Sequence, residues 1–247
     1  MTLNTNVNYM KTIFKAANDR GHANHGWLDS YHTFSFANYY NPQWEHFGAL
    51  RVLNDDHVSG GMGFGKHPHD NMEIVSIPLE GALEHQDSMG NKTVIRKGEV
   101  QIMSAGTGVA HSEKNEDAKN PVKFLQIWVF PEKRNIAPRY EQKVFDLEGR
   151  KDKFLTVVSP LGSSDEGIKM NQQSWFTLSD LSAGKTLYYK LKNAQNGVYV
   201  YILEGSAEIA GKSLGRRDGL GIWDTNTFEI KASADSEILL IEVPMIF

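Results

Sequence analysis

The chain has 247 residues, of which 40% are hydrophobic and 23% charged, and its formal net charge is -4. This is the composition of a globular protein, and it excludes a disordered, collagen-like or coiled-coil chain. The low charge, without a long run of Lys or Arg, argues against nucleic-acid and membrane-surface partners. Because there is no cysteine, disulfides, Fe–S clusters and thiol nucleophiles are excluded.

The ends and the apolar segments give no sign of export or membrane insertion. The N-terminus lacks the basic-then-apolar pattern of a signal peptide. Every apolar run is shorter than the roughly 20 residues that cross a bilayer. We therefore expect a cytoplasmic protein.

Short apolar runs bounded by Gly, Asn, Asp or Pro follow one another along the chain. They occupy residues 74–79, 100–103, 124–130, 198–203 and 238–243. Gly90 and Gly211 lie between such segments, where a tight hairpin needs a residue that adopts positive φ. The pattern predicts an all-β protein built as a barrel or sandwich.

The length and a charged, proline-containing middle segment predict two domains. We expect an N-terminal domain over residues 1–130, a linker over 131–150 and a C-terminal domain over 151–247. The alternative is that the middle segment is a long surface loop of one domain. A weak repeat favours two domains, because residues 79–84 resemble 203–208 and residues 97–99 resemble 218–220. The shorter offset of the second match predicts a shorter hairpin in the second copy.

All nine histidines lie within residues 1–111. Two pairs stand out, because His67 and His69 are two residues apart and so are His111 and Glu113. On an extended segment, residues two apart point to the same side. If the two segments are neighbouring strands, three imidazoles and one carboxylate converge, which suits a divalent transition metal with positions free for water, substrate or O₂. The alternative is two solvated pairs without a metal.

The segments that carry these pairs resemble the two motifs of cupins, and their departures from the cupin pattern resemble pirins. Residues 67–73 read His-Pro-His-x3-Glu, and residues 105–113 read Ala-Gly-x-Gly-x2-His-Ser-Glu. Similarity to bacterial pirin-like quercetin 2,3-dioxygenases extends to residues 26–36, 47–52, 85–91 and 219–224. The resemblance therefore covers nearly the whole chain.

The resemblance implies two stacked cupin barrels with one metal, in the N-terminal barrel. Its implied ligands are His67, His69, His111 and Glu113. Cupins in general take the carboxylate of the first motif, which here is Glu73, whereas pirins take the one after the third histidine. Glu73 is therefore expected beside the site or in a structural role, and reversed roles remain the alternative. The repeat offset takes His67 and His69 to Leu191 and Asn193, so we expect a metal-free second barrel.

The resemblance also implies a reaction: opening of a flavonol ring by O₂ with release of carbon monoxide. Glu113 would accept the proton of the flavonol 3-hydroxyl. Iron is the metal that the resemblance favours, although Zn, Ni, Cu, Mn and Co suit the same ligands. The expected partners are a flavonol-like aromatic substrate and O₂, and the chain is expected to be a monomer.

Two other functions remain open. One is a pirin-like regulator that binds protein partners in a metal-dependent way, with quercetin turnover as an incidental activity. The other is a barrel whose metal is purely structural.

The remaining histidines receive simpler interpretations. We expect His22, His25 and His32 to serve packing and hydrogen bonding, and His46, His57 and His85 to lie at the surface or in loops. Phe47, Met72 and Trp128 are candidates for the pocket wall, with core packing as the alternative for each.

Overall fold

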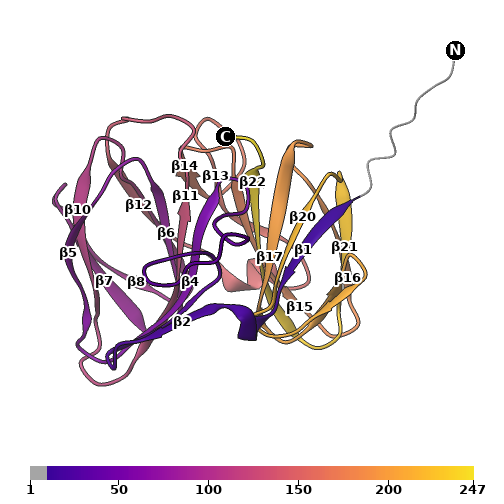
Figure 1. Cartoon of the computed structure of the whole chain (residues 1–247), viewed down its shortest axis with the longest axis horizontal. Helices are drawn as coiled ribbons and strands as arrows, with labels where there is room; N and C mark the ends of the chain where they lie inside the picture. The colour runs from indigo at the N-terminus through magenta and orange to yellow at the C-terminus, as the bar shows by residue number, and fades with distance from the viewer. Residues whose placement is uncertain (1–9) are drawn as a thin grey trace, which may run out of the picture.

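The structure is a computed structural model that describes residues 10–247. It consists almost entirely of strands, which confirms the all-β prediction. Figure 1 shows two barrel-shaped halves side by side, the first in indigo to magenta and the second in orange to yellow. The prediction that the N-terminus carries no signal peptide concerns residues 1–9 in part, and these lie outside the described residues.

The first half combines a seven-stranded and a four-stranded sheet. In spatial order the large sheet contains β12 (Arg139–Val144), β9 (Glu99–Ser104), β6 (Glu73–Glu80), β11 (Val122–Val129), β4 (Leu50–Val58), β3 (Leu28–His32) and β2 (Gly21–Asn24). The small sheet contains β5 (Gly63–His69), β10 (Val109–Asn115), β7 (Ala82–Asp87) and β8 (Lys92–Arg96).

The second half repeats this arrangement. Its large sheet contains β1 (Lys11–Lys15), β20 (Gly219–Trp223), β17 (Asn196–Glu204), β22 (Ser236–Pro244), β15 (Trp175–Leu181), β13 (Leu155–Pro160) and β14 (Ile168–Met170). The small sheet contains β16 (Thr186–Lys190), β21 (Thr227–Ala232), β18 (Ala207–Ile209) and β19 (Lys212–Leu214). Two short 3-10 helices, η1 (Ala17–Asp19) and η2 (Leu147–Arg150), complete the described elements.

The weak sequence repeat corresponds to equivalent strands. Strands β6 to β9 in the first half occupy the same sheet positions as β17 to β20 in the second. The matching turn glycines, Gly81 and Gly205, have φ values of 75° and 80°. The hairpin of β18 and β19 has shorter strands than that of β7 and β8, as the offset predicts.

Two strands pair with partners that the domain limits expected from the sequence did not assign to them. β1 lies near the N-terminus but pairs with β20, in the second half, where Figure 1 shows it in indigo beside the orange strands. Within the expected linker, β12 pairs with β9 as the edge strand of the first half. The two large sheets thus gain their edge strands in equivalent positions, from segments outside the sequence repeat. The division into independent domains stays a prediction.

The largest core cluster lies between the two large sheets. It joins side chains of β4, β6, β9 and β11 to side chains of β13, β15, β17 and β22. The opposite face of these strands points into each barrel, so that Tyr199 lies in the shared core and Val200 in the second barrel. Strands buried on both faces explain why the sequence shows continuous apolar runs instead of an alternation.

The two barrel interiors differ. The second barrel is filled by an apolar cluster that includes Leu181, Val198, Ile230 and Leu240. The first has two smaller apolar clusters and a cavity between them and the histidines. Between Met10 and Phe247, no helix reaches the length and apolar character that a membrane crossing needs.

Candidate metal centre

The strands β5 and β10 bring the two predicted pairs together. They are antiparallel neighbours in which His67 lies opposite His111, and His69 lies opposite Val109. A β-bulge between His111 and Glu113 shifts the register, and yet both side chains point to the interior because they are two apart on the strand. The structure therefore places His67, His69, His111 and Glu113 on adjoining strands of one sheet.

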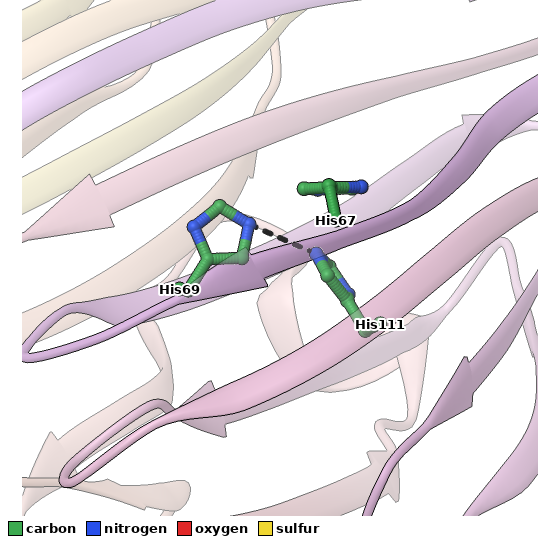
Figure 2. Close-up of side chains that lie close together, drawn as sticks. All are labelled: His67, His69 and His111. Atoms are coloured by element: carbon green, nitrogen blue, oxygen red, sulfur yellow. Dashed lines mark hydrogen bonds between the residues drawn. The ribbon is translucent and has the colours of Figure 1, made fainter.

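Three imidazoles converge at the centre of this arrangement. The Nε2 atoms of His69 and His111 are 3.1 Å apart, and the ring centroids of the three histidines are separated by 4.5 to 4.9 Å. Figure 2 shows the rings of His69 and His111 facing each other along a dashed line, with the ring of His67 seen edge-on beside them. One ring nitrogen from each lies within 4.8 Å of the others, which is a spacing that a single metal ion can bridge.

Hydrogen bonds on the outer side leave a free lone pair facing inward on two of these rings. The carbonyl of Gly65 can only accept, so Nδ1 of His67 donates to it at 2.7 Å, and in the neutral tautomer Nε2 is the ring nitrogen with the free lone pair. Nε2 of His85 donates to the Asp87 carboxylate at 3.1 Å. Burial lowers the pKa of His85, so its ring is neutral and its Nδ1 can accept from Nδ1 of His111, at 3.4 Å.

This chain from Asp87 through His85 leaves Nε2 of His111 without a proton, beside Nε2 of His69. Burial and the neighbouring imidazoles lower the pKa of His111 to about 2. Burial and His67 lower the pKa of His69 to about 4. Both rings are therefore neutral at pH 7, which is the form that binds a metal.

Glu113 is a buried carboxylate on β10 that lies beside His111, although the group of converging ligand atoms of His67, His69 and His111 does not include it. Nε2 of Gln126 donates to it at 2.6 Å and Oγ of Ser76 donates at 3.1 Å. Burial raises the pKa of Glu113 to about 7, and these two hydrogen bonds oppose the rise. Glu113 can thus hold or release a proton near neutral pH. Glu113, His85 and His111 also form a second group of converging ligand atoms.

Glu73, the alternative carboxylate, points elsewhere. Its Oε2 accepts from Oγ of Ser104 at 2.7 Å and from the backbone N–H of Asn171, in the second half, at 3.1 Å. Among the described residues, no converging group of potential metal ligands includes Glu73. Its contacts link the two halves.

His67, His69 and Glu113 border a cavity of about 500 Å³. Phe36 and Trp128 meet edge to face in its wall, with centroids 5.5 Å apart, and Leu28 and Phe64 add further apolar surface. Of the three predicted wall candidates, only Trp128 borders the cavity. Phe47 belongs to the core between the halves, and Met72 packs against the cluster of Ile74 and Met103.

Several residues border the cavity although the sequence did not indicate them as part of its wall. His22, His25 and His32 border the cavity, together with Ser30 and Asp56. Ser30 bridges Nε2 of His32, at 2.8 Å, and the carboxylate of Asp56. Strand alternation could have indicated Asp56, because it is two residues from Val58 and therefore shares a face of β4 with this apolar residue.

The prediction for His85 was wrong. It is fully buried on β7, stacked on Tyr140 at 4.8 Å, beside His111. The turn signals of residues 88–91 suggested a loop, but His85 lies on the strand before the turn, β7, which belongs to the small sheet and buries this side chain. His46 is exposed and His57 is partly buried on β4.

Comparisons with known proteins agree with this architecture. Residues 13–129 match the family model described as pirin, and residues 156–243 match the quercetinase C-terminal cupin domain. A solved structure of the bacterial pirin YhhW from Escherichia coli in complex with nickel(II) is 44% identical. It covers 96% of this chain and 100% of its own, with a TM-score of 0.90.

Curated relatives show the same near-complete coverage. A protein of Escherichia coli (strain K12) named quercetin 2,3-dioxygenase is 46% identical over 230 residues, which are 93% of this chain and 97% of the relative. A putative quercetin 2,3-dioxygenase of Pseudomonas aeruginosa is 43% identical and covers 90% of this chain and 95% of its own. With this identity over both halves, and with the paired barrels, the chain belongs to the pirin family.

Proposed function

We propose that the protein is a metal-dependent dioxygenase that opens the ring of a flavonol such as quercetin. The observation that carries the proposal is the convergence of three imidazoles, with a buried carboxylate beside them, next to an aromatic-walled cavity of about 500 Å³ that His67, His69 and Glu113 border. The names of the relatives give the substrate class. In this reaction both atoms of O₂ enter the opened product and carbon monoxide leaves.

The residues fit a divalent transition metal. His67, His69, His111 and Glu113 would hold it, because two of the imidazoles are kept neutral by burial and the carboxylate is adjacent. Three nitrogen donors and one oxygen donor, without sulfur, suit Fe, Mn, Co, Ni, Cu and Zn. We propose iron as the resident metal, while a solved relative holds nickel. When bound, the ion would act as a Lewis acid toward the oxygen atoms of the substrate.

Glu113 would accept the proton of the flavonol 3-hydroxyl. Its pKa, raised to about 7 by burial, lies near the working pH, which is where a general base is most effective. Gln126 and Ser76 donate hydrogen bonds to both carboxylate oxygens and hold their direction. Trp128 and Phe36, which meet edge to face, would contact the aromatic rings of the substrate and exclude water from them.

The test combines metal analysis with turnover. The purified protein is analysed for its metal, titrated with quercetin without oxygen, and then mixed with O₂ while quercetin loss and carbon monoxide are measured. We expect one metal per chain, a change in the metal absorption on quercetin binding, and one carbon monoxide per quercetin consumed. Quercetin loss without carbon monoxide would contradict the proposed ring opening.

The variant Glu113→Gln tests the role of the carboxylate and keeps its size. We expect turnover to fall about 10²- to 10⁴-fold, the contribution of a general base. Glu116→Gln, an exposed residue on the same segment, is the control and should match the wild type. Full turnover by Glu113→Gln with metal bound would refute the role of Glu113 as the base.

The turnover of the wild type separates the enzymatic from the regulatory function. A kcat/KM for quercetin far below about 10⁴ M⁻¹s⁻¹ would favour the regulatory function.

A further inference from the structure

A second cavity of about 500 Å³ lies where the two halves meet, and it is lined almost entirely by polar side chains. Arg20, after η1, and Tyr31 and Asp55, on β3 and β4, come from the N-terminal part of the chain. Arg216 and Arg217 come from the turn between β19 and β20. The site is therefore built from segments far apart in the sequence.

This cavity is separate from the metal centre, although they share a wall. Alternate residues of β3 and β4 face opposite ways, so that Ser30 and Asp56 border the metal cavity while Tyr31 and Asp55 border the second one. His22 is the one described residue that borders both.

Two guanidinium groups share one carboxylate at the base of the second cavity. The side chains of Arg20, Arg217 and Asp55 are 6%, 5% and 5% exposed. Oδ2 of Asp55 lies 2.7 Å from Nε of Arg217 and 3.5 Å from Nη1 of Arg20. A buried charge without a counter-charge is costly, and here the positive charges outnumber the negative ones.

The rim of the cavity carries further charged side chains. Arg216 forms an ion pair of 2.7 Å with Glu204, which also lies 3.8 Å from Arg217. Asp29, the other lining carboxylate, is held by Nε2 of His22 at 2.6 Å. In formal charge, Asp29, Asp55 and Glu204 balance the three arginines, but among the described residues only the carboxylate of Asp55 lies within 3.5 Å of the buried guanidinium groups of Arg20 and Arg217.

The arginines are held in place before any ligand arrives. Arg217 has φ of 67°, a left-handed conformation that is unfavourable for its residue type, and its Nη1 donates to the carbonyl of Leu203. Arg20 donates to Oη of Tyr201 at 2.7 Å, and its Cζ lies 4.8 Å from the ring centroid of Tyr31. Asp218 accepts a hydrogen bond from the backbone N–H of Ala17 at 2.8 Å, and this bond connects η1 to the turn that carries Arg216 and Arg217.

We propose that this cavity between the halves binds a small oxyanion, a carboxylate or a phosphate, through Arg20, Arg216 and Arg217. The planar fork of a guanidinium matches the two oxygens of either group. The ligand adds a second negative charge beside the buried guanidinium pair, which shares the one carboxylate of Asp55, and bridges the two halves. This site is independent of the proposed dioxygenase reaction.

The test is calorimetric titration of the metal-loaded protein with sodium phosphate and, separately, with sodium citrate, against sodium chloride at equal ionic strength. We expect phosphate, citrate or both to bind saturably, with one anion per chain. Binding of phosphate alone would identify a phosphate site, and binding of citrate alone would identify a carboxylate site. Arg216→Gln should weaken it about tenfold, which is about 1.4 kcal/mol. Arg216 is 55% exposed, so this change leaves the buried group of Arg20, Asp55 and Arg217 intact.

Two further variants locate the anion. Arg96→Gln removes an exposed arginine outside the cavity and should bind like the wild type. His69→Gln removes a proposed metal ligand, so an anion held by the metal would lose affinity there, whereas one held by the arginines would not. The proposal is overturned if neither anion binds more than chloride does, or if His69→Gln abolishes binding while Arg216→Gln retains it.

Discussion

The side chain of His85 decides how His111 presents its ring. Because Nε2 of His85 donates to Asp87, its Nδ1 is the acceptor for His111. His85→Leu removes that acceptor, and we expect metal affinity to fall about 10- to 100-fold, as for other losses of a partner behind a ligand. Competition with a fluorescent chelator measures this. Gln86→Leu, on the exposed face of the same strand, is the control, and equal affinities in the two variants would contradict the role of His85.

Glu73 gives the protein a pH-dependent stability. Burial raises its pKa to about 7, from 4.5, so the folded protein holds a proton that the unfolded chain releases. The stabilisation is complete below about pH 4.5 and is lost as the pH rises through 7. Glu73→Gln does not ionise, so its stability relative to the wild type should increase by about 3 kcal/mol between pH 4.5 and pH 8.

Chemical denaturation of Glu73→Gln and the wild type at both pH values measures this difference. Glu116→Gln, whose carboxylate is exposed, should show no such change. If the difference between Glu73→Gln and the wild type is the same at pH 4.5 and pH 8, the protonated state of Glu73 is not the cause.

The sequence could predict the convergence of the two histidine segments, because spacing and strand parity depend on local geometry alone. It could not predict His85 beside His111, or Ser30 and Asp56 in the cavity wall, because their positions depend on which strands pair and on how the barrel closes. The choice of Glu113 over Glu73 came from the family resemblance. The structure distinguishes the two carboxylates, because Glu73 accepts hydrogen bonds from Ser104 and from Asn171 in the second half.

At the scale of elements, the apolar runs located the central strands β6, β9, β11, β17 and β22 correctly. These strands are buried on both faces, so their sequences carry the strongest signal. The edge strands β1 and β12 were missed as sheet members. β12 is mostly partly buried or exposed and resembles a charged loop in sequence, and the pairing of β1 with β20 spans nearly the whole chain.

The edge strand β1 depends on a glycine in β20. A Cβ built on Gly221 would lie 2.5 Å from Cε2 of Phe47 and 2.9 Å from Cγ2 of Ile13, which is on β1. Gly221→Ala should therefore destabilise the protein by about 1 to 3 kcal/mol through overpacking. Gly215→Ala, whose Cβ would meet only Asp218 at 3.7 Å, should change stability by less than about 1 kcal/mol. Denaturant midpoints compare the two, and equal effects would contradict the packing explanation.

At the scale of the whole molecule, the two halves share more than a surface. The largest core cluster contains Phe47 and Leu125 from the first half and Phe176 and Ile241 from the second. Asp55 with Arg217, and Glu73 with Asn171, add polar links between the halves. Separating them would expose apolar side chains that are now fully buried, so neither half is expected to unfold alone.

Removal of the metal tests this coupling. A ligand present at 1,000 times its Kd stabilises the folded state by about 4 kcal/mol, and each kcal/mol shifts Tm by about 2 to 4 °C for a chain of this size. We expect calorimetry to show one cooperative transition that moves down as a whole when a chelator strips the metal from the first barrel. Two separate transitions, of which only one responds to the chelator, would show that the shared core does not couple the halves.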